Sequence, residues 1–457
     1  MPQLKLHNSL SGAKEDFHPI DPGHVRVYAC GPTVYSYAHI GNARMAVAFD
    51  QLVRVLRLLY PRVTYVSNIT DVDDKIIAAA AETGEAIDVL TRKYERIYNE
   101  DMKALGVTAP DIQPRATEHI AEMIALIETL VEKNHAYEAM GHVLFHVPSY
   151  PAYGRLSHRS RDDQIAGARV DISPFKKDPA DFVLWKPSAP DQPGWESPWG
   201  RGRPGWHIEC SAMAEKHLGL PFDIHGGGAD LKFPHHENEI AQSCCAHGLL
   251  NDPAGFARLW VHNGFLTVEG EKMSKSLGNF MLAHEVIREY PGEVLRMVLL
   301  SAHYRQPLDW SDHGVQQAKK YLDRLYQLLR DMKDIVPEQT GLPARVLGAL
   351  CDDLNTPMAF AAINDLTRTE QDKGVLKGQL LAIGGLLGLL QADPDAWFGY
   401  GAASGADAQR IEQLVAERQS AKKDKNYARA DEIRKQLEGE GIVIEDTPAG
   451  PKWRKAG

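Results

Sequence analysis

The chain has 457 residues, 25% of them charged and 44% hydrophobic, a composition typical of globular proteins with several domains. Its net charge of −10 excludes nonspecific nucleic-acid binding over the whole surface, although it allows a local basic patch. The most apolar run, residues 380–390, is too short and glycine-rich for a membrane span, and five cysteines without a CxxC pair argue against a disulfide framework. With no secretory signal recognised, we expect a cytoplasmic protein that does not enter a membrane.

The first hundred residues alternate strands and helices. Residues 25–28 alternate apolar and polar side chains as a strand does, the segment from 41 onward has helical spacing, and residues 63–66 resemble a second strand. This alternation predicts an α/β fold with a parallel sheet, whose ligands gather at the carboxyl ends of the strands. Side chains expected at such ends are Tyr28, Cys30, His39 and Thr70.

The segment His39-Ile-Gly-Asn42 lies where a strand and loop lead into a helix. A helix N-terminus has free N–H groups and a partial positive charge, and Gly41 has no Cβ to keep a ligand from the backbone. Phosphate binding is therefore expected here, although the tripeptide HIG alone is a weak signal.

Residues 116–205 have the character of an insertion. Ile120, Ile124, Ile127 and Val131 indicate an amphipathic helix, residues 142–147 a strand, and residues 188–206 a loop rich in proline and tryptophan. We expect a structural cap here, with the sheet resuming at residues 222–224 and 259–261.

A metal site is the second hypothesis. The segment from Phe233 is expected to begin a helix with Pro234 in its first turn, which places His235 and Glu239 four residues apart on one face. Together with the thiolates of Cys30 and Cys210 they make a plausible four-coordinate zinc site. From spacing alone the claim is weak, because single cysteines are more often buried apolar residues.

A lysine-containing segment follows. Residues 265–268 read as a strand, Glu269-Gly270 as a turn, and Lys272-Met-Ser-Lys-Ser276 as a loop whose two ammonium groups can cover a polyphosphate. Alone, such a loop is usually a solvated turn.

The rest of the chain is predicted to be mainly helical. Helices are expected at residues 315–336, 343–354, 357–369 and 373–390, followed by a flexible linker at 399–406. Residues 418–435 hold seven basic and three acidic side chains, a local charge of 7 − 3 = +4. A charge run of this size is usually a solvated face, although it could bind RNA.

Together, in this order, the His39–Asn42 and Lys272–Ser276 segments resemble the HIGH and KMSKS signatures of class I aminoacyl-tRNA synthetases. Asn42 departs from the family pattern, which usually ends in a second histidine, and it cannot become cationic. The resemblance implies ATP-binding by His39, Gly41, Asn42 and Lys275, with His39, Lys272 and Lys275 holding charge during catalysis.

Cys30, the segment WHIEC at 206–210 and GGGADLKFPHHENEIAQS at 226–243 look like the cysteinyl-tRNA synthetase family. The resemblance implies one zinc ion, held by Cys30, Cys210, His235 and Glu239, which binds the substrate sulfur. His236 and Glu237 are expected to face elsewhere, and Cys244, Cys245 and Cys351 to pack in the core. The implied substrates are L-cysteine, tRNA(Cys) and ATP with Mg²⁺. The implied cysteine pocket comprises Tyr28, Cys30, Gly31, Thr70 and Trp206.

The resemblance covers essentially the whole chain and implies a Rossmann-like catalytic domain with an insertion, an α-helical bundle and a small C-terminal anticodon-binding domain. Asp446, Trp453 and Arg454 are expected at or near the tRNA surface, and the protein is expected to be a monomer. The expected boundaries are 1–115 and 206–262 for the catalytic halves, 116–205 for the insertion, 263–313 for the lysine loop and stem-contact region, 314–398 for the bundle and 405–457 for the tail. Two alternatives are a ligase that joins cysteine to an amino sugar and a noncatalytic RNA-binding protein stabilised by zinc.

Overall fold

The computed structural model of the chain describes residues 2–160, 163, 174–273, 279–399, 406–447 and 450–455. Lys275 and most of the expected linker at 399–406 lie outside the described residues, as do the side chains of Lys272 and Arg454. The chain forms two compact units. One comprises residues 1–315, 342–366 and 386–388, and the other comprises residues 316–341, 367–385 and 389–457.

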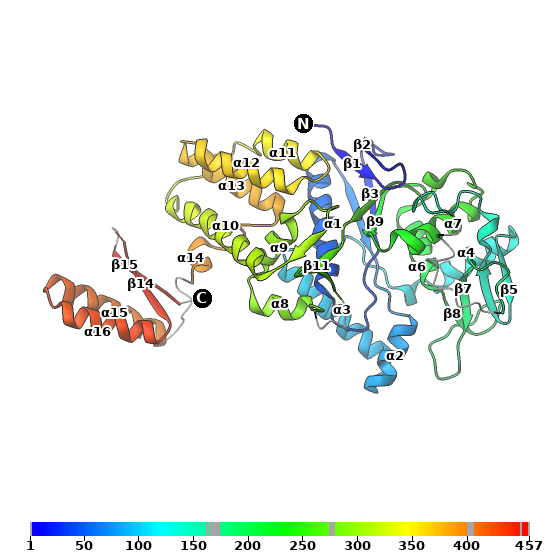
Figure 1. Ribbon diagram of the computed structural model, residues 1–457, viewed down its shortest axis with the longest axis horizontal. Helices are drawn as coiled ribbons and strands as arrows, with labels where there is room; N and C mark the ends of the chain where they lie inside the picture. Colours follow the sequence, from blue (N-terminus) through cyan, green and yellow to red (C-terminus); the bar gives the residue numbers. More distant parts are fainter. Residues whose placement is uncertain are drawn as a thin grey trace. The chain divides into compact units, whose positions relative to one another are not determined.

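A four-stranded parallel sheet is the centre of the first unit, in the order β10-β9-β3-β4 (Figure 1). Its strands are β3 (Val25–Ala29), β4 (Val63–Ser67), β9 (Phe222–Gly228) and β10 (Ala257–Asn263). These strands are rich in β-branched and aromatic residues and are largely buried, as expected for a parallel sheet covered on both faces. The predicted α/β fold class is confirmed.

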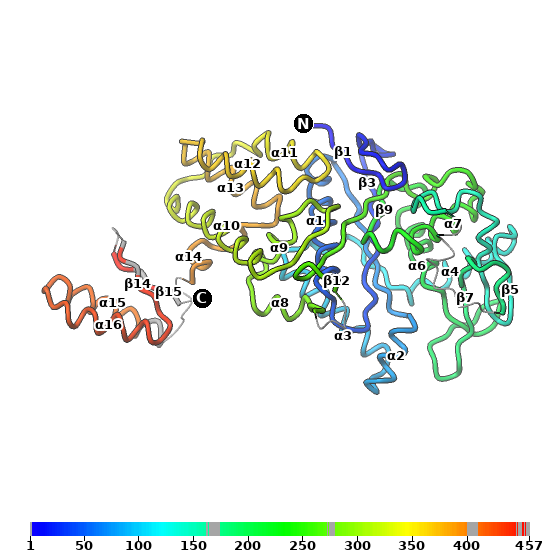
Figure 2. The backbone as a smooth tube through the Cα atoms, viewed as in Figure 1, coloured from blue at the N-terminus to red at the C-terminus, as the bar shows by residue number. Residues whose placement is uncertain are grey.

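Helix α1 (Ile40–Leu59) connects β3 to β4. Figure 2 shows the backbone passing from β3 into this long helix. Its apolar side chains at helical spacing, including Val47, Leu52 and Val55, are buried. The helix begins directly after His39, whose backbone N–H donates a hydrogen bond to Asn42 Oδ1 at 3.2 Å. The side chain of Asn42 therefore caps the start of this helix.

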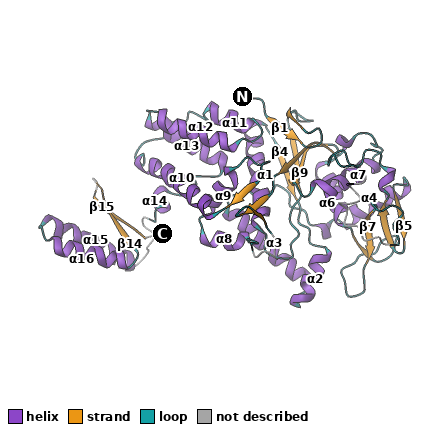
Figure 3. Cartoon of the chain, viewed as in Figure 1, coloured by secondary structure: helices purple, strands orange, loops and turns teal. Residues whose placement is uncertain are grey.

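The insertion forms a separate antiparallel sheet, β5-β6-β7-β8, drawn apart from the parallel sheet in Figure 3. Helix α4 (Ile120–Glu132) packs beside it and against helices of the catalytic region, and its buried face carries Met123, Ile127 and Leu130. The strands of this sheet are β5 (Ala136–Ala139), β6 (His142–Phe145), β7 (Phe182–Pro187) and β8 (Gly202–Pro204).

The other elements of the catalytic region are short strands and helices. Two hairpin strands, β1 (Lys5–Asn8) and β2 (Ala13–Asp16), precede the parallel sheet, and a small sheet follows it in the order β12-β11-β13. The strands of that sheet are β11 (Leu266–Val268), β12 (Glu271–Lys272) and β13 (Leu308–Trp310). The helices are α2 (Asp74–Thr83), α3 (Ile87–Ala104), α6 (Trp206–Leu218), α7 (Glu237–Ala246), α8 (Ala283–Glu289) and α9 (Gly292–Ser301).

The later part of the chain is helical, as predicted. Its helices are α10 (Asp312–Asp331), α11 (Ala344–Cys351), α12 (Thr356–Thr369), α13 (Lys373–Leu387) and α14 (Pro394–Trp397). Asn355 Oδ1 accepts a hydrogen bond from the N–H of Met358 at 3.1 Å and so caps the start of α12. Helices α15 (Ala406–Lys423) and α16 (Tyr427–Gly439) precede the hairpin of β14 (Ile442–Thr447) and β15 (Gly450–Lys455). Among the described residues, no helix is long and apolar enough to cross a membrane.

Candidate functional site

A buried cluster of thiol, imidazole and carboxyl groups lies at the carboxyl end of β3. Cys30 directly follows that strand, Cys210 lies on α6, His235 on a π-helical turn (Lys232–His236) and Glu239 in the first turn of α7. The Sγ atom of Cys30 lies 3.6 Å from Cys210 Sγ and 3.6 Å from Glu239 Oε1, and His235 Nε2 lies 3.0 Å from Glu239 Oε1. All four candidate donor atoms lie within 4.8 Å of one another, so the four predicted ligands are together.

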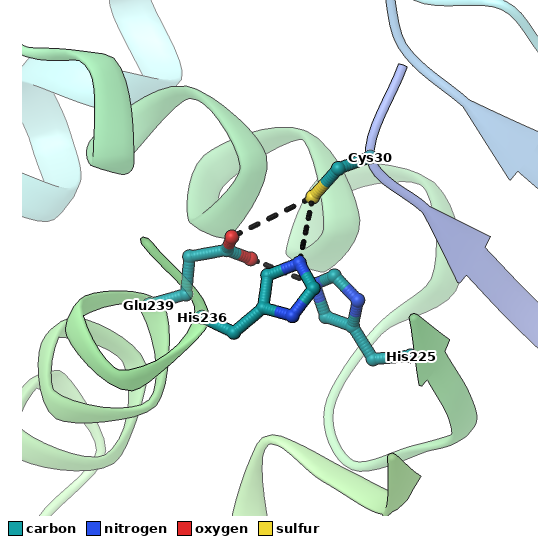
Figure 4. A group of neighbouring side chains, drawn as sticks. All are labelled: Cys30, His225, His236 and Glu239. Carbon is teal, nitrogen blue, oxygen red and sulfur yellow. Dashed lines mark hydrogen bonds and ion pairs between the residues drawn. The ribbon is translucent and has the colours of Figure 1, made fainter. Parts of the chain in front are cut away.

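A second set of four donors shares Cys30 and Glu239 with the first, as Figure 4 shows. His225, on β9, places Nε2 2.7 Å from Glu239 Oε2, and His236 places Nε2 3.3 Å from Cys30 Sγ. The expectation that His236 faces elsewhere is therefore wrong. The physical reason is spacing, because His236 and Glu239 are three residues apart and therefore neighbours on the helix surface, just as His235 and Glu239 are at four.

Glu237 does face elsewhere, as expected. Its carboxylate accepts hydrogen bonds at 2.8 Å from the backbone N–H groups of Gly154 and Ser157, which belong to the insertion. Three other cysteines are also buried, in agreement with the prediction that they pack in the core: Cys244, Cys245 and Cys351.

The electrostatics of the cluster favour donors that can bind a metal. Although burial opposes ionisation, the imidazoles of His225 and His235 hold the pKa of the Glu239 carboxyl well below its usual range. The hydrogen bond with Cys30 lowers the pKa of the Cys210 thiol to about 6. Burial opposes protonation of His235, but Glu239 and Cys210 raise its pKa to about 10. Burial, Cys210 and Glu239 also raise the pKa of the Cys30 thiol well above its usual range, so a metal ion would displace the protons of both His235 and Cys30.

The residues predicted for the cysteine pocket surround this cluster. The ring of Tyr28 is buried 5.2 Å from the ring of His225, and Trp206 is 40% exposed with its ring stacked 4.1 Å from that of His235. Gly31 cannot carry a side chain, because a Cβ there would lie 1.6 Å from the carbonyl oxygen of Asn68. The Thr70 hydroxyl donates to Glu209 Oε2 at 2.8 Å.

The start of α1 lies beside Met273 and residues 280–281, which come before and after residues 274–278 outside the described part of the chain. A Cβ added at Gly41 would lie 3.5 Å from Met273 Cε, so the residue after Lys272 reaches this helix. Beyond the segment, Ile40 N–H donates to the carbonyl of Met281 at 3.0 Å, and the ring of Phe280 lies 5.5 Å from that of His39. The fold thus brings Met273 of the second motif to the first motif, and contacts of both motifs with a ligand stay a prediction.

The C-terminal helices and hairpin share a small apolar core of their own. Trp453 is 9% exposed and packs in this core, so its ring is largely buried, and its expected place at or near the tRNA surface stays a prediction. A small module has few large apolar side chains, and the tryptophan supplies much of the buried area. Asp446 is exposed and accepts hydrogen bonds from Arg418 at 2.8 and 3.0 Å and from Lys422 at 2.5 Å. Tyr427, which the sequence analysis did not single out, is 64% exposed at the start of α16.

Sequence reasoning missed two side chains of the cluster region. His225 lies in the middle of β9, where it pairs with Tyr28 of β3, so the rule that ligands gather at strand ends does not identify it. Glu209 is buried beside Cys210, and burial raises the pKa of its carboxyl well above the usual range. Its Oε1 has no hydrogen-bond partner among the residues that the structure describes. No pattern in the segment WHIEC distinguishes that glutamate from a solvated one.

Comparisons with known proteins agree with this arrangement. A family model described as the tRNA synthetases class I (C) catalytic domain matches residues 16–320, and one described as the cysteinyl-tRNA ligase anticodon binding domain matches residues 408–454. The chain is 60% identical to a cysteine–tRNA ligase of Parvibaculum lavamentivorans, covering 99% of this chain and 98% of the relative. It is 57% identical to a cysteine–tRNA ligase of Rhodospirillum rubrum, covering 99% and 100%.

Solved structures show the same fold at low sequence identity. A LeuRS of Agrobacterium radiobacter superposes with a TM-score of 0.58 at 14% identity, covering 84% of this chain and 86% of that chain. A methionyl-tRNA synthetase of Mycobacterium tuberculosis superposes with a TM-score of 0.55 at 18% identity, covering 86% and 85%.

Proposed function

The chain belongs to the cysteine–tRNA ligases, a family of class I aminoacyl-tRNA synthetases, and from this premise we propose which of its residues carry each step. The family membership and the enzyme class expected from the sequence are confirmed. In this activity the carboxylate of cysteine attacks the α-phosphate of ATP and pyrophosphate leaves. The 3′-terminal ribose hydroxyl of tRNA(Cys) then attacks the carbonyl of the adenylate and AMP leaves.

The metal bound by the buried cluster is proposed to be a single zinc ion with the ligands Cys30, Cys210, His235 and Glu239. The observation that supports this set is the grouping of two thiols, an imidazole and a carboxylate within 4.8 Å, all of them donors that zinc prefers. When bound, zinc supplies a Lewis-acid centre that accepts the thiolate of cysteine far better than the hydroxyl of serine. Shape alone distinguishes small side chains by only about 1–3 kcal/mol, so a chemical difference must be recognised.

Neighbouring side chains orient these donors. His225 donates to Glu239 Oε2 at 2.7 Å and so leaves Oε1 to face Cys30 and His235. Metal ligands are commonly fixed by such outer hydrogen bonds. Trp206 stacks on His235 and, with Tyr28, Gly31 and Thr70, is proposed to form the pocket for the rest of the cysteine.

ATP, with Mg²⁺, is proposed to bind at the start of α1. His39, the backbone at Gly41 and the side chain of Asn42 would face the phosphates, and Lys272 and Lys275 would cover them. These groups act by holding developing charge, since no protein nucleophile is required. The capping of α1 by Asn42 supports this reading, because it fixes the helix N-terminus without a cationic group at that position.

The C-terminal tail is proposed to contact the anticodon of tRNA(Cys), with Asp446 and Arg454 at or near that surface. Trp453 would then act through the core that supports the hairpin. The exposed ring of Tyr427 is a better candidate for stacking on an unpaired base, because Lys425 and Arg429 flank it in sequence. The ligase is proposed to act in the cytoplasm as a monomer.

The two alternatives are less well supported. A cysteine to amino-sugar ligase would use the same activation site, but it has no need of the anticodon-binding region that matches residues 408–454. A noncatalytic RNA-binding role is not what membership of a ligase family implies.

A matched pair of cysteine variants tests the metal site. We expect wild type and Cys245→Ala to retain about one zinc per chain after gel filtration and Cys210→Ala to lose it, because only Cys210 belongs to the donor cluster while both cysteines are buried. Metal analysis reads the result directly. Equal zinc content in all three proteins would exclude Cys210 as a ligand.

A further inference from the structure

Arg44, one turn into α1, is a buried arginine with no carboxylate partner among the described residues. Its side chain is 2% exposed, and burial lowers its pKa to about 10, so it is still charged at neutral pH. The guanidinium donates instead to five backbone carbonyls, those of Gly264 (3.0 Å), Phe265, His303 (3.4 Å), Tyr304 (3.4 Å) and Gln306. A charge removed from water is tolerated only where such dipoles compensate it.

The five carbonyls belong to two segments that are themselves joined. Gly264 N–H donates to the carbonyl of Tyr304 at 2.8 Å, and Leu308 N–H donates to that of Phe265 at 3.0 Å. Gly264 is required for this approach, because a Cβ there would lie 2.5 Å from the carbonyl oxygen of Gln306. Arg44 therefore fastens both segments to α1 at the place where they meet.

Asp353 holds the second segment from another side. Its carboxylate accepts hydrogen bonds from the Tyr304 hydroxyl and from Arg305 Nε, both at 2.8 Å. Residues 303–306 are thus fixed by a cation through their carbonyls and by an anion through their side chains. The position of this loop is determined by specific polar contacts as well as by apolar packing.

The fastened segment leads directly to Lys272. Phe265 precedes β11, which turns at Glu269 and Gly270, two residues with positive φ, and returns as β12. In that hairpin Thr267 pairs with Lys272. Arg44 lies three positions after Gly41 on α1, and a Cβ at Gly41 would contact Met273. Arg44 therefore links the helix that begins at His39 to the base of the hairpin that carries Lys272.

We propose that Arg44 is a positioning residue for adenylate formation. Its hydrogen bonds to carbonyls of residues 264–265 and 303–306 set the distance between the His39 end of α1 and the hairpin that carries Lys272. This inference rests on the proposed role of Lys272 and Lys275 in binding ATP. Arg44 itself touches no substrate in this account. Its effect is to keep the His39 end of α1 and the hairpin that carries Lys272 at a fixed distance. A misplacement of about 1 Å can cost about 100-fold in rate.

The test compares Arg44 with a second buried arginine that has a different neighbourhood. Arg296 is fully buried and binds Asp50 and the carbonyls of Leu387 and Leu105, none of them in the lysine hairpin or its base. Arg44→Met and Arg296→Met each remove one buried guanidinium from the full-length, zinc-replete enzyme. The readouts are the unfolding temperature, the zinc content, and kcat and the two KM values of cysteine-dependent ATP–pyrophosphate exchange.

We expect both methionine variants to unfold at a lower temperature. Assayed well below that temperature, Arg44→Met should lose about 100-fold in kcat with KM for cysteine and zinc content within twofold of wild type, whereas Arg296→Met should keep kcat within threefold. Arg44→Lys, which keeps the charge but offers three donors to five acceptors, should lose about 10-fold and takes the place of Arg44→Met if that variant does not fold.

Exchange by Arg44→Met, or by Arg44→Lys in its place, within threefold of wild type would overturn the proposal. So would an equal loss in Arg296→Met, because the effect would then be one of general stability. The variant Lys272→Ala distinguishes a failure of the Arg44 proposal from a failure of the proposed ATP-binding role of Lys272. If Lys272→Ala exchanges as fast as wild type, the lysine hairpin does not act on ATP, whatever Arg44 does.

Discussion

At the scale of the residue, the metal cluster depends on side chains that orient other side chains. Glu239 faces Cys30 and His235 with one oxygen because His225 holds the other. Cys30 Sγ lies 3.3 Å from Nε2 of His236, and Nδ1 of His236 lies 2.8 Å from Nε2 of His262. Each donor is thereby kept in one orientation before any substrate arrives, and a zinc ion bound there would meet a preorganised set.

Lys275 is the residue whose role most needs a direct test, because it lies outside the described part of the chain. Lys275→Ala should reduce the rate of adenylate formation by about 10²- to 10³-fold, since one contact to developing charge is lost, while cysteine binding changes less than twofold. Pre-steady-state measurement of adenylate formation and equilibrium binding of cysteine distinguish the two.

Lys216→Ala is the matched control for this experiment. That lysine forms a surface ion pair with Glu122 at 2.8 Å and should leave both quantities unchanged. Equal losses of cysteine binding and adenylate formation in Lys275→Ala would contradict a role confined to the transition state.

At the scale of the element, function is placed by where strands and helices end. The end of β3 provides Cys30 and the start of α1 provides His39, whereas His225 comes from the middle of β9. The chain beyond the lysine segment also returns to this place, because Ala283 N–H donates to the carbonyl of Ala38 at 2.9 Å. Segments more than 200 residues apart are therefore joined by backbone hydrogen bonds.

The C-terminal helices and hairpin form a module with its own core, so their removal tests one step of the reaction alone. A chain ending at residue 404 should keep cysteine-dependent pyrophosphate exchange within twofold and lose at least about 10-fold in kcat/KM for charging of tRNA(Cys). Contacts to unpaired bases are worth about 1–3 kcal/mol each, so the loss of one or more is measurable. Tyr427→Ala in the intact chain should show part of this loss. Undiminished charging by the shortened chain would refute an anticodon role for the tail.

Several features were predictable from the sequence because residue type and spacing determine them. The sheet and α1 followed from periodicity, and the grouping of Cys30 with Cys210, His235 and Glu239 followed from the family resemblance. The approach of His236 could have been predicted from spacing, because His236 and Glu239 are three residues apart and such residues are neighbours on a helix surface. The role inferred for Arg44 was hidden, because its partners are backbone carbonyls, which no residue type in the sequence reveals.

At the scale of the whole molecule, the chain combines a site for choosing the amino acid with a site for activating it. The donor cluster and the His39 end of α1 both lie at the carboxyl edge of one parallel sheet, as expected for this kind of fold. In the proposed function the amino acid is chosen by its sulfur at the first site and joined to phosphate at the second. The selectivity that we propose depends on zinc.

The most direct test is ATP–pyrophosphate exchange with cysteine and with serine, before and after zinc is removed by a chelator. The zinc-replete enzyme should exchange with cysteine and not measurably with serine, and the zinc-free enzyme should lose exchange with cysteine and recover it when zinc is restored. Zinc-free protein that activates cysteine as fast as the replete enzyme, or replete enzyme that activates serine as well as cysteine, would contradict selection by the metal.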